Sequence, residues 1–294
     1  MDDMYGTILI PTDGSEAATA AVSAVVPLAE RFGASIRALN VIDLSQVTPA
    51  LRDEAETELT DHAEAVTAEV VDAADSAGID AVADWVSTTE PVHRAIIEYA
   101  TGFGVDLIAM GTTAGDGLKR MALGSTARRT LRYAPQPVLT VSADATRGGE
   151  LDTILHPTDG SDGAVAAADH AIELAAGFEA GLHVINVVDV SGPWATLESS
   201  DLLVAFEAAG RDAVDAVIDR AENREILSVQ ATVLNGTPAS VITDYATDRD
   251  VDLIVMGTHG RTGLERVLLG SVAERVVGTA NVPVLAVKPP GATD

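Results

Sequence analysis

The segment from Gly257 to Ser271 carries the residues with the clearest chemical potential. Its glycines allow the backbone to turn sharply and to approach a ligand without a Cβ in the way. The pair Gly270-Ser271 then opens a stretch with helical periodicity, so the first amides of a helix lack internal partners there and favour an anion such as phosphate. Arg261 and Arg266 could close over that anion. A Walker A loop is excluded, because no Gly-Lys-Ser or Gly-Lys-Thr follows the glycines.

Two other segments place polar residues directly after short apolar runs. They are Pro157-Thr158-Asp159-Gly160-Ser161 and Asn186-Val187. In open parallel sheets, ligands bind beyond the carboxyl ends of the strands, where the strand order reverses. We therefore expect both segments to meet the glycine-bearing segment at one binding site. A plainer interpretation stays open for Asp159, because Asp-Gly is common turn chemistry.

The whole chain is an internal repeat. The run Ile8–Ser15 recurs 146 residues later as Ile154–Ser161, and Gly124-Ser125 recurs at Gly270-Ser271 with the same offset. A repeat of this length indicates two copies of one domain. We predict a first domain over residues 1–143, a linker over residues 144–150 and a second domain over residues 151–294.

Each copy alternates short apolar runs with longer helical stretches. In the first copy the expected strands, near-continuously apolar as in a sheet buried on both faces, are Thr7–Ile10, Ser35–Val41, Ala81–Val86, Val105–Met110 and Val138–Val141. The expected helices are Glu16–Arg31, Arg52–Ala77, Val92–Thr101 and Ser125–Tyr133. This alternation predicts two tandem doubly wound α/β domains, each with a five-stranded, mainly parallel sheet and about four helices.

Composition excludes several classes of function. The net charge of −27 repels phosphate backbones and anionic lipid, so we expect neither nucleic-acid nor membrane binding. Cysteine is absent and the six histidines lack ligand spacing, so no zinc or iron site is expected. The acidic N-terminus and the lack of a long apolar run predict a cytoplasmic protein. The scarcity of lysine beside abundant aspartate favours a halophile, with an acidic mesophile protein as the alternative.

The spacing Gly257-x2-Gly260-x9-Gly270-Ser271, with both Pro-Thr-Asp-Gly-Ser segments, resembles the universal stress protein family over nearly the whole chain. The resemblance implies a tandem, ATP-binding stress-response protein. In such members the first-strand Asp and a second-strand Val face adenine, while the glycine loop and the Gly-Ser pair take ribose and phosphates. The implied positions are Pro157, Thr158, Asp159, Val187, Met256, Gly257, His259, Gly260, Arg261, Gly270, Ser271 and Val272, with Pro11, Thr12, Asp13, Val41, Gly111, Gly124 and Ser125 in the first copy.

The first copy departs from the family pattern at Ala114, which stands where the second copy has Gly260. If Gly260 has a positive φ, alanine there costs roughly 1–2 kcal/mol or moves the loop. We therefore expect the second copy to bind nucleotide more tightly. Mg²⁺ held by the phosphates and one of Asp13 or Asp159 is compatible with this site.

The resemblance leaves other functions open. No nucleophile–base pair is visible, so we expect no catalytic residue and at most slow ATP hydrolysis. A ligand-independent scaffold for partner proteins is the other alternative. Final strands in this family pair across a dimer, so Val138–Val141 and Val284–Val287 are expected to pair within one chain, and two chains could associate further.

Overall fold

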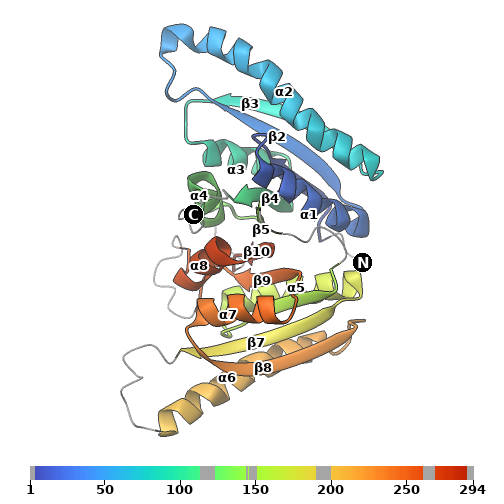
Figure 1. Cartoon of the computed structure of the whole chain (residues 1–294), viewed down its shortest axis with the longest axis vertical. Helices are drawn as coiled ribbons and strands as arrows, with labels where there is room; N and C mark the ends of the chain where they lie inside the picture. Colours follow the sequence, from blue (N-terminus) through green and yellow to red (C-terminus); the bar gives the residue numbers. More distant parts are fainter. Residues whose placement is uncertain are drawn as a thin grey trace. The chain divides into compact units, whose positions relative to one another are not determined.

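The computed structural model describes residues 4–112, 123–143, 145, 151–189, 200–260 and 269–289, apart from the side chains of residues 200–202. The chain divides into two compact units, residues 1–149 and residues 150–294. Figure 1 labels the helices and strands of both units.

The first unit alternates strands and helices throughout its described part. Its elements are β1 (Thr7–Pro11), α1 (Glu16–Phe32), β2 (Ser35–Asp43), the 3-10 turn Pro49–Leu51, α2 (Arg52–Ser76), β3 (Ala81–Thr88), α3 (Val92–Gly102), β4 (Leu107–Thr112), α4 (Ser125–Tyr133) and β5 (Val138–Ser142).

The second unit repeats this order. Its elements are β6 (Thr153–Pro157), α5 (Asp162–Phe178), β7 (Gly181–Asp189), α6 (Ser200–Ala221), β8 (Ser228–Gly236), α7 (Pro238–Asp248), β9 (Leu253–Gly257), α8 (Ser271–Thr279) and β10 (Val284–Val287).

Both sheets are parallel and share one topology. The strand order is β3-β2-β1-β4-β5 in the first unit and β8-β7-β6-β9-β10 in the second. The order therefore reverses between β1 and β4, and between β6 and β9. Contacts place α1 and α2 against one face of the first sheet, and α3 packs with α4 on the other; α5 with α6 and α7 with α8 repeat this. The predicted doubly wound α/β fold is confirmed, and within the described ranges no helix is long and apolar enough to cross a bilayer.

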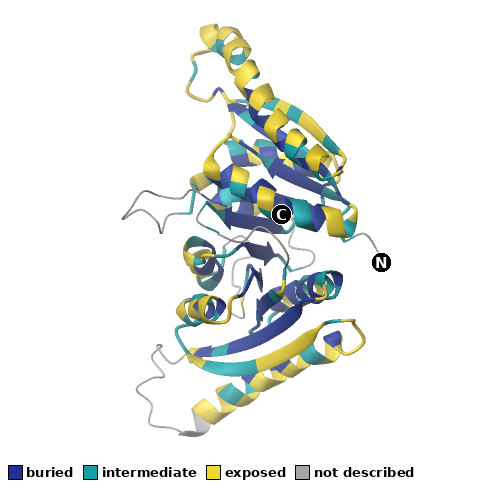
Figure 2. Ribbon diagram, turned by 45° about the vertical axis from the view of Figure 1, so that its right-hand side comes forward, coloured by how far each residue is buried: buried dark blue, intermediate teal, exposed yellow. Residues whose placement is uncertain are grey.

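The central strands form the core, whereas one edge strand of each unit is open to solvent. Ile8, Leu9 and Ile10 of β1 are fully buried, while Val82 and Trp85 of β3 are 50% and 36% exposed. Figure 2 shows the same contrast in the second unit, where β8 is largely yellow beside the dark blue β7. The expectation of burial on both faces is therefore wrong for Ala81–Val86, because β3 pairs with β2 alone among the described strands.

One repeated aspartate fixes the start of the first strand in each unit. The Oδ2 atom of Asp106 accepts hydrogen bonds of 2.9 Å from the amides of both Gly6 and Thr7. Asp252 accepts from the amides of Asp152 and Thr153 in the same way. The sequence Val-Asp-Leu-Ile occurs at residues 105–108 and again at residues 251–254. This recurrence has a structural cause, because the carboxylate satisfies two amides where the chain enters the sheet.

Candidate nucleotide site

The turn after β6 is built by its own side chains. The hydroxyl of Thr158 accepts from the amide of Gly160 at 3.2 Å, and Oδ1 of Asp159 accepts from the amide of Ser161 at 3.0 Å. The turn after β1 has the same two bonds, from Gly14 to Thr12 and from Ser15 to Asp13. The turn interpretation of the aspartates therefore holds for one carboxylate oxygen, Oδ1, in each unit.

The asparagine before each candidate valine ties two strand ends together. Asn186 in β7 is buried and donates from Nδ2 to the carbonyl oxygen of Thr158 at 2.8 Å. Asn40 makes the matching bond to Thr12 at 2.8 Å. Val187 follows Asn186 directly and lies on the pocket described below. The repeated Asn-Val pair thus holds the valine beside the turn that carries Asp159.

Gly257 is required by packing against α5. A Cβ on Gly257 would lie 2.5 Å from the carbonyl carbon of Gly163 and 2.8 Å from the amide nitrogen of Ala164. The first unit has the same crossing, where a Cβ on Gly111 would lie 2.3 Å from the carbonyl carbon of Ala17. Gly257 was expected to let the backbone approach a ligand. That interpretation is incomplete, because the start of α5 already occupies the space where a Cβ would lie.

Gly260 has a different role from the one expected. Its φ is not in the left-handed region, so the conditional strain argument for alanine does not apply. A Cβ at Gly260 would instead lie 2.8 Å from Oδ2 of Asp159. The absence of a side chain at Gly260 therefore leaves the Asp159 carboxylate in its observed position.

The segment between β9 and α8 ends at Gly270. The amide of Gly270 donates to the carbonyl oxygen of Thr258 at 2.8 Å, so this hydrogen bond joins the two ends of the segment. Gly270 is also the N-cap of α8 and supplies no side-chain cap. The first amides of α8, from Ser271 onward, are therefore available to an anion at this end of the sheet.

Two side chains anchor the start of the loop. The hydroxyl of Ser161, the N-cap of α5, donates to the carbonyl oxygen of His259 at 3.2 Å and accepts from the amide of Ala164 at 3.3 Å. The hydroxyl of Thr258 lies 2.8 Å from Nδ1 of His259 and 3.3 Å from the carbonyl oxygen of Val287. The His259 ring is therefore held by Thr258.

These elements enclose a pocket of about 380 Å³ in the second unit. It brings together the predicted residues Pro157, Thr158, Asp159, Val187, Met256, Gly257, His259, Gly260, Gly270, Ser271 and Val272. Arg261 lies outside the described residues. Sequence reasoning missed further lining residues, which are Ala164, Ile185, Asp189, Pro238, Ile242, Thr258 and Ala273. The signal that could have located α7 is Pro238, because proline is common at the first position of a helix. The structure makes Pro238 equivalent to Val92, the first residue of α3, while Pro91 is the N-cap of α3.

The first unit has a matching pocket of about 340 Å³. All seven predicted residues of that copy line it, namely Pro11, Thr12, Asp13, Val41, Gly111, Gly124 and Ser125. Gly124 is the N-cap of α4 and, like Gly270, supplies no side-chain cap. The two pockets are thus built from equivalent strand ends and equivalent helix starts.

A buried histidine lies directly before the turn in β6. His156 is fully buried, and its Nδ1 lies 2.8 Å from the carbonyl oxygen of Val255. Burial lowers the pKa of His156 to about 4, against the opposing effects of the Val255 hydrogen bond and of Asp159 and Asp169. The equivalent residue of the first unit is Ile10, which is buried to the same degree.

His156→Ile is expected to reduce the loss of stability on acidification. An unfolded chain binds a proton at histidine near pH 6.5, whereas folded His156 resists protonation until about pH 4, so its contribution falls as the pH falls between these values. Between pH 7.5 and pH 5 the variant should lose about 2 kcal/mol less stability than the parent chain. Urea unfolding at both pH values measures this difference, and the other histidines cancel because both proteins carry them. Equal losses of stability in the variant and the parent chain would show that His156 is not buried in the neutral form.

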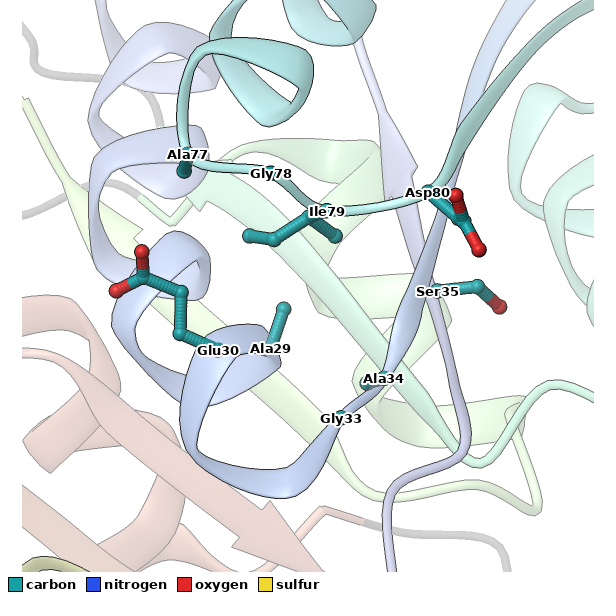
Figure 3. A pocket seen from close by; sticks show the side chains of 9 residues that line it. All are labelled: Ala29, Glu30, Gly33, Ala34, Ser35, Ala77, Gly78, Ile79 and Asp80. Carbon is teal, nitrogen blue, oxygen red and sulfur yellow. The ribbon is translucent and has the colours of Figure 1, made fainter.

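Another hollow, of about 370 Å³, lies at the opposite ends of the strands in the first unit (Figure 3). It is bordered by the ends of α1 and α2 and the starts of β2 and β3. Figure 3 shows its two carboxylates, Glu30 and Asp80, on opposite sides of the hollow, so they do not converge on one ligand atom. We assign it no function.

The chain is similar to known proteins in both sequence and fold. A sequence model described as the universal stress protein family matches residues 4–142 and again residues 150–288. A universal stress protein of Methanocaldococcus jannaschii is 46% identical over 154 residues, which cover 49% of this chain and 87% of that protein. One from Mycolicibacterium smegmatis is 32% identical over 210 residues, covering 68% of this chain and 67% of that protein.

The fold comparison agrees with the sequence comparison. The crystal structure of a universal stress protein from Archaeoglobus fulgidus DSM 4304 has a TM-score of 0.74 with this chain, at 24% identity. The match covers 97% of this chain and 99% of that one. At this identity the likeness supports the fold alone.

Proposed function

The chain belongs to the universal stress protein family, and from that premise and the pocket geometry we propose that it binds an adenine nucleotide, with ATP as the first candidate. The binding would serve a regulatory or protective role in the stress response, because a bound nucleotide shifts the chain toward whichever conformation it prefers. Slow hydrolysis of ATP stays an alternative that this proposal does not need.

The observation that carries the proposal is the mixed lining of the pocket in the second unit. Apolar side chains such as Val187, Ile242 and Met256 line the same cavity as the uncapped start of α8. An apolar surface suits a planar base, and free helix amides suit phosphate oxygens. A nucleotide is the common small molecule that combines both parts, and the volume of about 380 Å³ is typical of a small-molecule site.

We further propose that the second unit binds the adenosine part more tightly than the first. The support is steric, because a Cβ at Gly260 would lie 2.8 Å from Oδ2 of Asp159. The first copy has Ala114 at the matching position of the sequence. An alanine in the position of Gly260 would compete with the Asp159 carboxylate for space, and we therefore propose weaker binding in the copy whose sequence has alanine.

The remaining partners stay predictions. Asp13 lines the first pocket and Asp159 the second, and either could hold Mg²⁺ that is bound to nucleotide phosphates. Within the described part of the chain, no three His, Asp or Glu side chains form a metal site of their own. Pairing of the final strands within the chain and association of two chains also stay predictions.

Release of the bound small molecule tests the proposal without a choice of ligand in advance. The full chain is purified, denatured and filtered, and the filtrate is analysed by mass spectrometry. We expect an adenine nucleotide in the filtrate, or saturable binding of added ATP by the stripped, refolded chain. A filtrate without nucleotide, together with no ATP binding at millimolar concentration, would contradict the proposal.

A further inference from the structure

The two pockets share their layout but differ in charge at the helix that starts at each of them. In the first unit, Arg128 is the fourth residue of α4 and Arg129 follows it, and the first turn of α4 holds no acidic residue. In the second unit the equivalent of Arg128 is Glu274, at the start of α8. The N-terminal ends of α4 and α8 therefore carry opposite charges at one equivalent position, positive at Arg128 and negative at Glu274.

Arg128 lies close to the pocket wall. Gly124 and Ser125, which precede it by four and three residues, both line the pocket of the first unit. Residues at these spacings share one helix face, and side chains on a helix lean toward its N-terminus. Arg128 is exposed and directly follows Ala127, the last residue of α4 that lines the pocket.

The position of Arg128 is electrostatically unusual for a helix start. A helix N-terminus carries partial positive charge, which favours Asp or Glu and disfavours arginine. Glu274 follows this preference in α8 and Arg128 opposes it in α4. An anion in the first pocket would therefore be nearer a positive side chain at this helix position, and an anion in the second pocket nearer a negative one.

The carboxylates beside the two pockets do not account for this difference. Asp159 and Asp189 line the second pocket, and Asp13 and Asp43 hold the equivalent places in the first unit, after β1 and at the end of β2. The loop segments 111–124 and 257–270 carry equal net charge in the sequence. The charge difference between the two sites therefore lies at the starts of α4 and α8.

We propose that the two sites differ in phosphate preference: the first unit favours the nucleoside triphosphate over the monophosphate more strongly than the second unit does, with Arg128 and Glu274 as the residues that set the difference. This inference rests on the proposed nucleotide binding. It concerns the increase in affinity that the added phosphates give. This increase is separate from the higher affinity for adenosine that is proposed for the second unit.

The test isolates each site within the full chain. Val41 and Val187 line the first and second pockets and are partly exposed, so tryptophan at either position should fill one pocket and leave the fold intact. In each background, affinities for AMP and ATP are measured by calorimetry in 0.1 M salt with EDTA. The quantity compared is the ratio of the Kd for AMP to the Kd for ATP.

We expect this ratio to be higher at the first site. Arg128→Glu should lower the ratio there about tenfold, and Glu274→Arg should raise it about tenfold at the second site, with adenosine affinity unchanged at both. The matched control is Arg132→Glu, which makes the same charge change four residues further from the helix start and should alter the ratio much less. At 1 M salt all these effects should shrink, because the Debye length falls to about 3 Å.

Equal ratios at the two sites, or a charge exchange that leaves the ratio unchanged, would overturn the inference while nucleotide binding itself stands. Absence of binding at both sites would instead overturn the proposed function. If Arg128→Glu does not fold, Glu274→Arg at the second site still decides the matter.

Discussion

Gly111→Ala is expected to destabilise the first unit by about 3 kcal/mol or more. The new Cβ would lie 2.3 Å from the carbonyl carbon and 2.5 Å from the carbonyl oxygen of Ala17, which belong to the main chain of α1. Main-chain atoms cannot rotate aside as a side chain can, so α1 must move away from β4 and give up buried contacts. Urea unfolding of the full chain measures the loss as a lower transition midpoint for this unit.

Gly102→Ala is the matched control within the same unit. Gly102 is the last residue of α3, it is exposed, and no atom lies within 4 Å of a Cβ built there. Alanine should therefore leave stability unchanged or raise it by up to about 1 kcal/mol. If Gly111→Ala were as stable as Gly102→Ala, the close contact between α1 and β4 would be wrong.

Asp159→Ala is expected to weaken adenosine binding at the second site about 30-fold, which corresponds to about 2 kcal/mol. The variant removes the carboxylate that is proposed to face the base, and it also removes the acceptor for the Ser161 amide. Asp159→Asn retains an oxygen for that amide and so separates the two roles. We expect Asn to preserve the stability of the turn and still lose most of the affinity, as measured by titration with adenosine in the Val41→Trp background.

Gly260→Ala provides an independent check on the role of Asp159. Its Cβ would lie 2.8 Å from Oδ2 of Asp159, so the carboxylate must move. We expect about a tenfold loss of adenosine affinity when Asp159 is present and less than a twofold loss in the Asp159→Ala background, because contacting residues are not additive. Equal losses in the two backgrounds would mean that Gly260 acts by another route than Asp159.

Local signals in the sequence were sufficient to predict most of the fold. The helix predicted over Ser125–Tyr133 has these bounds in the structure, and α1 begins at the predicted Glu16. Both depend on short-range features, namely apolar periodicity and, for α1, a serine N-cap whose hydroxyl accepts from the amide of Ala18. Because the two copies share one sequence pattern, each prediction for one copy applied also to the other.

The parts that the sequence did not predict depend on contacts between distant segments. The exposure of β3 follows from its place at the end of the strand order, which its own residues do not encode. The reason for Gly257 lies in α5, and the reason for Gly260 lies in the turn at Asp159. Ile242 reaches the pocket from α7, so its location became evident only when the helix was placed beside the sheet.

Calorimetric titration of the full chain with ATP, repeated with each pocket filled, tests the central claim most directly. The account predicts two binding events in the unaltered chain, one in Val41→Trp, one in Val187→Trp and none in the double variant, with all four proteins folded by circular dichroism. ATP that binds equally well to the double variant, or an unaltered chain that binds no ATP at millimolar concentration, would contradict it.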